Sequence, residues 1–226
     1  MTPFQWAVHI SAWIPLALII YDGLRGDLTA NPIQAVTFRT GKPALVLLVL
    51  SLAATPLNTV FGFKPALKVR RALGLYAFMY VALHFLIFIG LDYGFDLSLL
   101  KGAIFEKRYA LVGFAAFLIL LPLAITSTKG WKARLGKKWR RLHQFVYLAG
   151  ILAVIHYVWL VKSDIREPLV YGGILVLLLI LRVSTVRKKI TGLKSRFAKG
   201  LRIGWGTIVS SLRPSGKPDP KTLKNS

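Results

Sequence analysis

The sequence contains no cysteine and only eight acidic residues among 226. Without cysteine the chain cannot form a disulfide, use a thiolate in catalysis, or ligate zinc or an iron–sulfur cluster through sulfur. Any redox chemistry must therefore use a bound cofactor. The chain also lacks an internal repeat, a glycine-rich nucleotide fingerprint and a soluble segment long enough to bind NAD(P)H.

Apolar residues are abundant instead. They make up 55% of the chain, and the mean hydropathy is +0.57. A soluble domain of this length could not bury so many apolar positions, so lipid is the expected solvent. A membrane-spanning helix needs about 20 mostly apolar residues. The sequence therefore predicts an all-α polytopic membrane protein with six transmembrane helices, at Phe4–Tyr21, Pro43–Val60, Ala72–Leu91, Tyr109–Thr126, Leu142–Val161 and Leu169–Val183.

The distribution of charge predicts the orientation of these helices. Three connecting segments, Lys64–Arg71, Lys129–Arg141 and Arg182–Ser226, hold 23 of the 31 basic residues and a single acid. The opposite segments hold the other eight basic residues and seven acids. Because Lys and Arg accumulate on the cytoplasmic side, we expect a bacterial inner-membrane protein with both termini in the cytoplasm. This topology explains the net charge of +23 without any nucleic-acid partner.

The chain is expected to divide into a membrane domain, residues 1–184, and a basic cytoplasmic tail, residues 185–226. In the tail, apolar residues recur at steps of three and four among lysines and arginines: Ile190, Leu193, Phe197, Leu201 and Trp205. This pattern is typical of a basic amphipathic helix lying on the inner leaflet, with a helix docked on a partner as the alternative. From Arg213 onward, the Pro, Ser, Gly and Lys content predicts disorder.

Four histidines are the candidate functional residues: His9, His84, His143 and His156. Ionisable side chains inside a membrane are costly and usually functional. A single buried histidine often only forms a hydrogen bond across a bundle. Here all four lie in or at the ends of predicted helices, and none lies in the basic tail, which favours a functional role.

Depth along the helices sorts the histidines into two levels. His156 lies roughly 20 Å along its helix from His143, and His84 lies roughly 18 Å from the inner start of the third helix. His84 and His156 are thus expected at one level in the outer half, and His9 and His143 at another near the inner face. Two neutral imidazoles facing each other across a bundle are a standard axial pair for haem iron. Zinc is less suited, because two histidines alone leave its coordination incomplete.

The angular spacing of the fifth predicted helix complicates this arrangement. On an ideal helix, His143 and His156 lie roughly 140° apart around the axis. Either the helix is overwound or bulged near Gly150, or the two sites lie on different sides of it. The basic segment Lys129–Arg141 suits a flavin phosphate or an acidic reductase, although the positive-inside bias alone also explains it.

Several motifs along the membrane part resemble the MsrQ (YedZ) family. They are Thr40-Gly41, Arg70-Arg71-x-Leu73-Gly74-Leu75 leading to Leu83-His84, Arg108-Tyr109, Ala124-x-Thr126-Ser127, Leu135-Gly136-Lys137-x-Trp139-x-x-Leu142-His143-x-Phe145-Val146-Tyr147, and Ile155-His156-Tyr157-x-Trp159. The resemblance extends from about Phe4 to Val183.

The resemblance implies a ferric-reductase-like transmembrane bundle that binds haem b and is also associated with flavin mononucleotide (FMN). It implies His84 and His156 as axial ligands of the iron and His143 as a further ligand, whereas the role of His9 is the least defined. Members of this family pass electrons from the quinone pool or a cytosolic flavin reductase to a periplasmic molybdopterin enzyme, MsrP, which reduces methionine sulfoxide in oxidised envelope proteins. The chain is then an electron-transfer subunit and not the catalytic reductase.

Three other functions remain open from the sequence. One is a ferric-reductase-like oxidoreductase with another acceptor. A transporter would need discontinuous helices or polar residues lining a path. Neither is evident in the sequence, although Pro56 and Pro122 could break helices. A membrane anchor for a partner enzyme would need no buried histidines.

Overall fold

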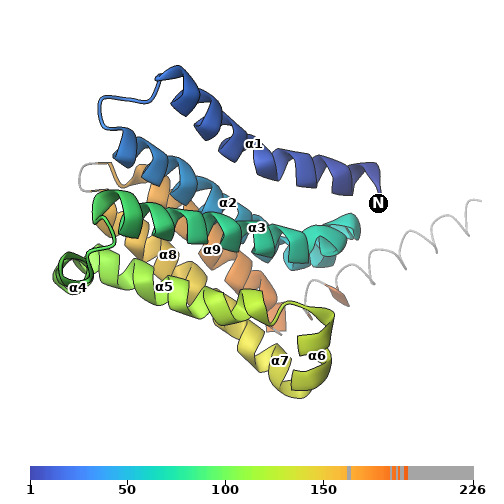
Figure 1. The fold of residues 1–226 in the computed structure, drawn as a ribbon. Helices are drawn as coiled ribbons and strands as arrows, with labels where there is room; N and C mark the ends of the chain where they lie inside the picture. The colour runs from blue at the N-terminus through green and yellow to red at the C-terminus, as the bar shows by residue number, and fades with distance from the viewer. Residues whose placement is uncertain (162–163, 184, 187, 189–190, 193–226) are drawn as a thin grey trace, which may run out of the picture. The chain divides into compact units, whose positions relative to one another are not determined.

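The computed structural model describes residues 1–161, 164–183, 185–186, 188 and 191–192 (Figure 1). Met1–Val183 form one compact unit, and Ser184–Ser226 form a second. The apolar stripe predicted between Ile190 and Trp205, and the disorder predicted after Arg213, lie outside the described residues.

The compact unit is built from helices throughout its described residues, so the predicted all-α class is confirmed. The elements are α1 (Pro3–Arg25), α2 (Pro32–Phe61), α3 (Pro65–Ile87) with a π-helical turn (Phe88–Asp92), α4 (Leu97–Glu106), α5 (Arg108–Ile125), α6 (Lys129–Leu135), α7 (Lys137–Leu142), a 3₁₀ turn (His143–Phe145), α8 (Val146–Leu160) and α9 (Arg166–Arg182).

Each of the six predicted transmembrane segments corresponds to a helix. Five helical stretches are long and apolar enough to cross a membrane: α1, α2, α3 with its π-helical turn, α5, and the stretch from Lys137 to Leu160. The sixth, α9, has 17 residues, at the lower end of the range of about 17–25 that spans a bilayer. The chain is a polytopic membrane protein.

The start of α2 was wrongly predicted. The helix begins at Pro32 rather than at Pro43, because the Asn31 side chain accepts a hydrogen bond from the Gln34 amide (3.1 Å) and caps it. A proline in the first turn is typical of helix starts, and Pro32 occupies that position. The correction matters for function, since it places residues 32–42 on a helix rather than in a loop.

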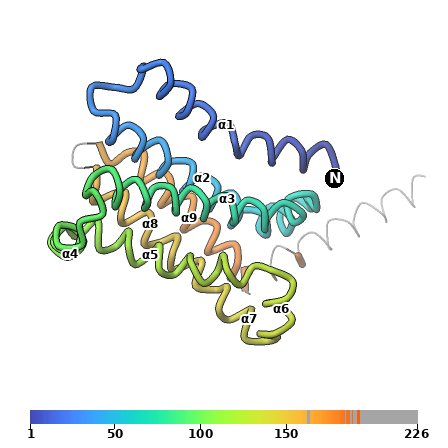
Figure 2. Tube along the Cα trace, viewed as in Figure 1, coloured from blue at the N-terminus to red at the C-terminus, as the bar shows by residue number. Residues whose placement is uncertain are grey.

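Helix α1 bends near its middle, as the tube in Figure 2 shows. Pro15 lies inside this helix, and it lacks the amide hydrogen needed to continue the series of backbone hydrogen bonds. The fully buried Tyr80 of α3 joins two backbone groups of α1 at the bend. Its hydroxyl donates to the Ala12 carbonyl (2.7 Å) and accepts from the Leu16 amide (3.1 Å). Tyr80 thus holds α1 against α3 at the bend.

A second proline is compensated in a similar way. Pro56 lies inside α2, so the Leu52 carbonyl, four residues earlier, has no amide partner within the helix. The Arg182 guanidinium at the end of α9 donates to this carbonyl, and also to the Tyr147 hydroxyl of α8. Arg182 therefore joins α2, α8 and α9, and it provides the external partner that a proline-broken helix needs within a membrane.

The bundle has two distinct ends (Figure 1). At the α4 end, α2 and α5 begin and α3 finishes. At the opposite α6–α7 end, α3 begins, α5 finishes, and Met1 also lies there in the view of Figure 1. Neither α4 nor the pair α6 and α7 was predicted, because these helices are too short and too rich in charge to resemble a transmembrane span.

Candidate functional site

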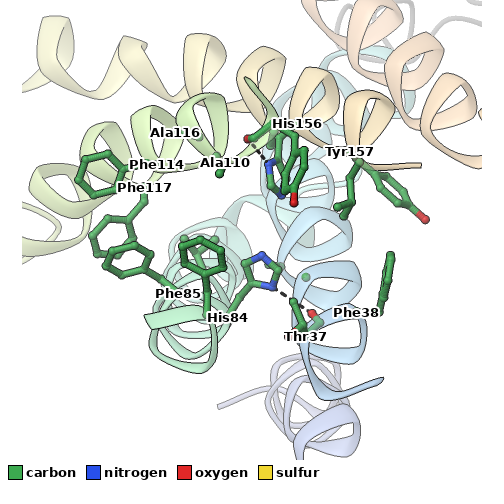
Figure 3. Close-up of a pocket in the computed structure, with 18 of the residues that line it drawn as sticks. Thr37, Phe38, His84, Phe85, Ala110, Phe114, Ala116, Phe117, His156 and Tyr157 are labelled. Atoms are coloured by element: carbon green, nitrogen blue, oxygen red, sulfur yellow. Dashed lines mark hydrogen bonds between the residues drawn. The ribbon is translucent and has the colours of Figure 1, made fainter. Parts of the chain in front are cut away.

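His84 of α3 and His156 of α8 lie opposite one another between the helices (Figure 3). Their ring centroids are 6.1 Å apart, and the ring planes are nearly perpendicular, at 86°. The two residues are separated by 72 positions in the sequence, and the structure brings them together at one level, where their helix depths predicted them to be.

The His84 ring is fixed by the backbone of α2. Its Nδ1 lies 2.9 Å from the Thr37 carbonyl oxygen. Because a carbonyl only accepts, Nδ1 carries the hydrogen, and the lone pair of the neutral ring belongs to Nε2. Gly41 permits this close approach, since a Cβ at that position would lie 3.2 Å from Cε1 and Nδ1 of His84.

The His156 ring is fixed in the same way by α5. Its Nδ1 lies 2.7 Å from the Tyr109 carbonyl oxygen, so Nε2 again carries the lone pair. Gly113 lies directly beside the ring: a Cβ there would lie 2.6 Å from Nδ1 and 2.8 Å from Cε1 of His156. A backbone carbonyl and a helix glycine thus hold each histidine.

Both histidines line a cavity of about 540 Å³, within the range of about 300–1,000 Å³ that is typical of ligand sites. Its walls are mainly apolar and aromatic. Phe85 of α3 stacks on Phe117 of α5 with centroids 4.4 Å apart, and Phe114 lies beside them (Figure 3).

Many polar residues of the cavity lie near helix ends at the α4 end of the bundle, and Lys42 lies further along α2. They include Asn31, Gln34, Asp92, Tyr93 and Lys107. The Lys107 ammonium donates to the Tyr93 hydroxyl (2.9 Å), and this hydrogen bond raises the pKa of Lys107 above its usual value. The cavity therefore has an apolar interior and a polar, charged rim.

The residues present fit a haem. Metal-binding histidines commonly donate their second ring N–H to a backbone carbonyl, which fixes the tautomer, and both histidines do so here. Two imidazoles that share one metal at bonds of about 2 Å have ring centroids roughly 6 Å apart, which matches the observed 6.1 Å. In the described part of the chain, no group of three or more His, Cys, Asp or Glu side chains could hold a metal ion. The pair thus suits a metal that brings its other ligands with it.

His143 lies away from this cavity, in the 3₁₀ turn that precedes α8. Its Nε2 lies 3.1 Å from Oγ1 of Thr126, and its ring stacks on Trp139 with centroids 4.0 Å apart. The Thr126 hydroxyl donates to the Pro122 carbonyl (2.6 Å), so its oxygen accepts from Nε2–H of His143. If Nε2 of His143 ligated iron, it would have to give up its proton and this hydrogen bond to Thr126.

His9 of α1 engages a different partner. Its Nδ1 lies 2.8 Å from the Tyr76 hydroxyl of α3, and the two rings meet edge to face with centroids 5.6 Å apart. The hydrogen bonds and ring contacts of His9 and His143 therefore go to different residues. Their roles as haem ligands remain predictions.

The residues that hold the two central histidines were not predicted from the sequence. Gly41 was noted only as part of a motif, and Gly113 was not noted. A glycine inside an apolar helix costs about 1 kcal/mol relative to alanine, and it commonly marks a close approach to a neighbouring group. Glycines within apolar helices were thus a readable signal in the sequence. The roles of the Thr37 and Tyr109 carbonyls have no sequence signal, because every residue has a backbone carbonyl.

Comparisons with known proteins show which proteins this chain is similar to. The family described as "Ferric reductase like transmembrane component" matches residues 40–154. A protein from Rhodospirillum rubrum named "protein-methionine-sulfoxide reductase heme-binding subunit MsrQ" is 46% identical over 188 residues, covering 82% of this chain and 90% of that protein. Proteins of the same name from Xanthomonas euvesicatoria (46% identical; 78% of this chain, 84% of that protein) and Xanthomonas oryzae (45%; 76% and 82%) are also similar. No solved structure matches the chain.

Proposed function

Because the chain belongs to the MsrQ family of heme-binding subunits of protein-methionine-sulfoxide reductases, we propose that it is a b-type haem electron-transfer subunit with His84 and His156 as the axial ligands. The observation that carries this proposal is the pair of histidines whose tautomers are both fixed by backbone carbonyls, at the spacing of ligands to one metal. Haem b supplies one-electron chemistry when it is bound.

The residues of the chain perform the remaining tasks. The Nδ1–H groups of His84 and His156 donate hydrogen bonds to the carbonyls of Thr37 and Tyr109. The lone pair of each neutral Nε2 is therefore free to ligate a metal without rearrangement of the ring. The aromatic walls around Phe85 and Phe117 exclude water and lower the local dielectric, which tunes the reduction potential. The arrangement supports electron transfer through the bound haem.

The charge asymmetry gives the proposed direction of transfer. The basic segment of α6 and α7 is assigned to the cytoplasm, and the α4 end to the periplasm. Electrons then enter from the quinone pool or a cytosolic flavin reductase, and they leave at the α4 end toward a periplasmic molybdopterin reductase of the MsrP type. That enzyme would repair methionine sulfoxide in oxidised periplasmic proteins.

The absence of cysteine makes this orientation easy to test. Ser98→Cys at the α4 end and Gly130→Cys in α6 each introduce a single thiol at an exposed position. A membrane-impermeant maleimide is expected to label Ser98→Cys in intact spheroplasts and Gly130→Cys only after lysis. The reverse pattern would contradict the orientation but not the haem site.

The FMN that the resemblance implies remains a prediction. The described residues between Lys129 and Arg141 would supply cations for its phosphate. Flavin released from the purified protein by denaturation, and measured by its fluorescence, tests this separately from haem.

Absorption spectroscopy tests the central proposal. We expect a reduced b-type haem spectrum from the purified full-length chain, which His84→Ala and His156→Ala each abolish. Leu86→Ala is a matched control, because this exposed neighbour lies on the same helix as His84. A colourless but folded wild-type protein from haem-replete cells would refute the proposal.

A further inference from the structure

Two lysines stand at the rim of the cavity, and neither takes part in holding the histidines. Lys42 lies on α2 and Lys107 immediately precedes α5, and both line the cavity together with Asp92. A cation beside a low-dielectric site is costly unless it is paired or reaches water. Both lysines are exposed at this rim, so each can also bind an anion that enters the cavity.

Each lysine lies close to the backbone that supports one histidine. Lys42 directly follows Gly41, which packs against His84. Lys107 lies two residues before Tyr109, whose carbonyl holds His156. One cation thus lies on α2 and the other immediately before α5, the two helices that fix the pair of histidines.

Each ammonium is oriented by a neighbour and retains further donors. Lys42 Nζ lies 2.8 Å from Oε1 of Glu167, whose other oxygen accepts from the Tyr157 hydroxyl (2.9 Å). Lys107 Nζ donates to the Tyr93 hydroxyl. Since an ammonium has three N–H donors, each lysine can still bind a carboxylate.

The shape of the polarity matches the proposed cofactor. Haem b has two carboxylate groups on one edge of an otherwise apolar macrocycle, and this cavity combines mainly apolar walls with polar residues at the α4 end and at Lys42. Asp92 at the same rim would repel a carboxylate, so the two lysines are the groups able to offset that repulsion.

We propose that Lys42 and Lys107 bind the two carboxylates of the haem. The assignment rests on the proposed function. It makes Lys42 and Lys107 cofactor-binding residues, and Glu167 a positioning residue that aims Lys42.

The haem midpoint potential of the purified, haem-loaded full-length chain provides the test. A nearby cation disfavours the oxidised haem, which carries one more positive charge. In a medium of effective dielectric about 20, loss of a unit charge at the cofactor edge lowers the equilibrium constant for reduction by roughly tenfold, equivalent to about 59 mV for one electron. Lys42→Gln and Lys107→Gln should each show this fall, whereas Lys42→Arg should not. Lys101→Gln on α4, exposed and outside the cavity lining, is the control.

A second cause of a lower haem potential must be distinguished from the loss of carboxylate binding. Lys42→Gln also leaves the Glu167 carboxylate without its cation, and an unpaired negative charge near haem lowers the potential by itself. The double variant Lys42→Gln/Glu167→Gln removes both charges. A potential that stays low in the double variant supports carboxylate binding, and a return to the wild-type potential overturns it for Lys42.

The same contact can be tested by changing the cofactor instead of the lysines. The full-length chain, produced in haem-limited cells, is titrated with haem or with haem dimethyl ester, whose carboxylates are uncharged. Both lysine variants should weaken binding of haem and leave binding of the ester unchanged. Equal loss for both cofactors would overturn the assignment. A wild-type chain that binds no haem would instead refute the proposed function.

Discussion

Gly113→Ala adds a single methyl group to the wall behind His156. The new Cβ would lie 2.6 Å from Nδ1 and 2.8 Å from Cε1 of the ring. Ordinary van der Waals contact begins near 3.4 Å, so the imidazole or the helix must move by close to 0.8 Å (3.4 minus 2.6). The imidazole cannot move away without lengthening its 2.7 Å contact with the Tyr109 carbonyl.

The cost can be estimated from these contacts. Forcing an extra methyl group into a packed site costs about 1–3 kcal/mol, and loss of the hydrogen bond adds about 0.5–1.5 kcal/mol. The gain in helix propensity from glycine to alanine returns about 1 kcal/mol. Disturbing a group that orients a metal ligand typically lowers metal affinity about 10–100-fold. We expect a loss of haem affinity in that range, while the fold remains intact.

Two other helix glycines turn this expectation into a graded series. Gly41→Ala brings a Cβ to 3.2 Å from the His84 ring, a milder clash that should weaken haem binding less. Gly173→Ala on α9 meets nothing within 4 Å and should bind haem like the wild type. Haem titration of each purified variant, with thermal unfolding as a check on folding, gives the ranking.

Gly113→Ala and Gly173→Ala must differ in haem affinity if the His156 ring sets that affinity. If Gly113→Ala binds haem as tightly as Gly173→Ala, with an unchanged reduced spectrum, then the position of the His156 ring is not what determines affinity. A Gly113→Ala variant that unfolds outright would leave the ranking to Gly41→Ala, which must still bind more weakly than Gly173→Ala.

Three further outcomes follow from contacts elsewhere in the bundle. Tyr80→Phe removes the hydroxyl that bridges the bend of α1, and thermal unfolding should show a loss of about 1–3 kcal/mol with the haem spectrum retained; an unchanged unfolding temperature would contradict the bridge. Arg182→Met should destabilise the chain by a similar amount, and adding Pro56→Ala, which restores the missing backbone donor, should recover part of that loss, whereas two independent, additive effects would contradict the pairing. Haem-to-protein stoichiometry should fall in His143→Ala, and in His9→Ala if this residue is also a ligand; unchanged stoichiometry in both variants would rule out a second site built on them.

The sequence predicted the central pair of histidines because helix depth depends on few variables. Once the charge pattern fixed the direction of each helix, a rise of about 1.5 Å per residue was enough to place His84 and His156 at one level. The six apolar segments were likewise readable, since the thickness of a bilayer determines their length.

Local backbone geometry was harder to predict. An overwound helix near Gly150 was one expectation for the segment between His143 and His156. The chain is overwound there, but in a 3₁₀ turn at His143–Phe145, and Gly150 lies within the regular helix α8. The start of α2 at Pro32 depended on a cap by Asn31, a short-range signal that the apolar pattern of the span obscured. Contacts such as that between His156 and Tyr109 depend on helix packing, which no local pattern encodes.

The two histidines are steadied by main-chain carbonyls, and this has a consequence for how the site can vary. Any amino acid at position 37 or 109 still offers a carbonyl oxygen, so the tautomers of both imidazoles are insensitive to the side chains at these positions. Positions 41 and 113 are the reverse, because any side chain there meets an imidazole. Among relatives of this protein, we therefore expect positions 41 and 113 to stay glycine wherever the histidine pair is kept, whereas the tautomers themselves require no particular side chain at position 37.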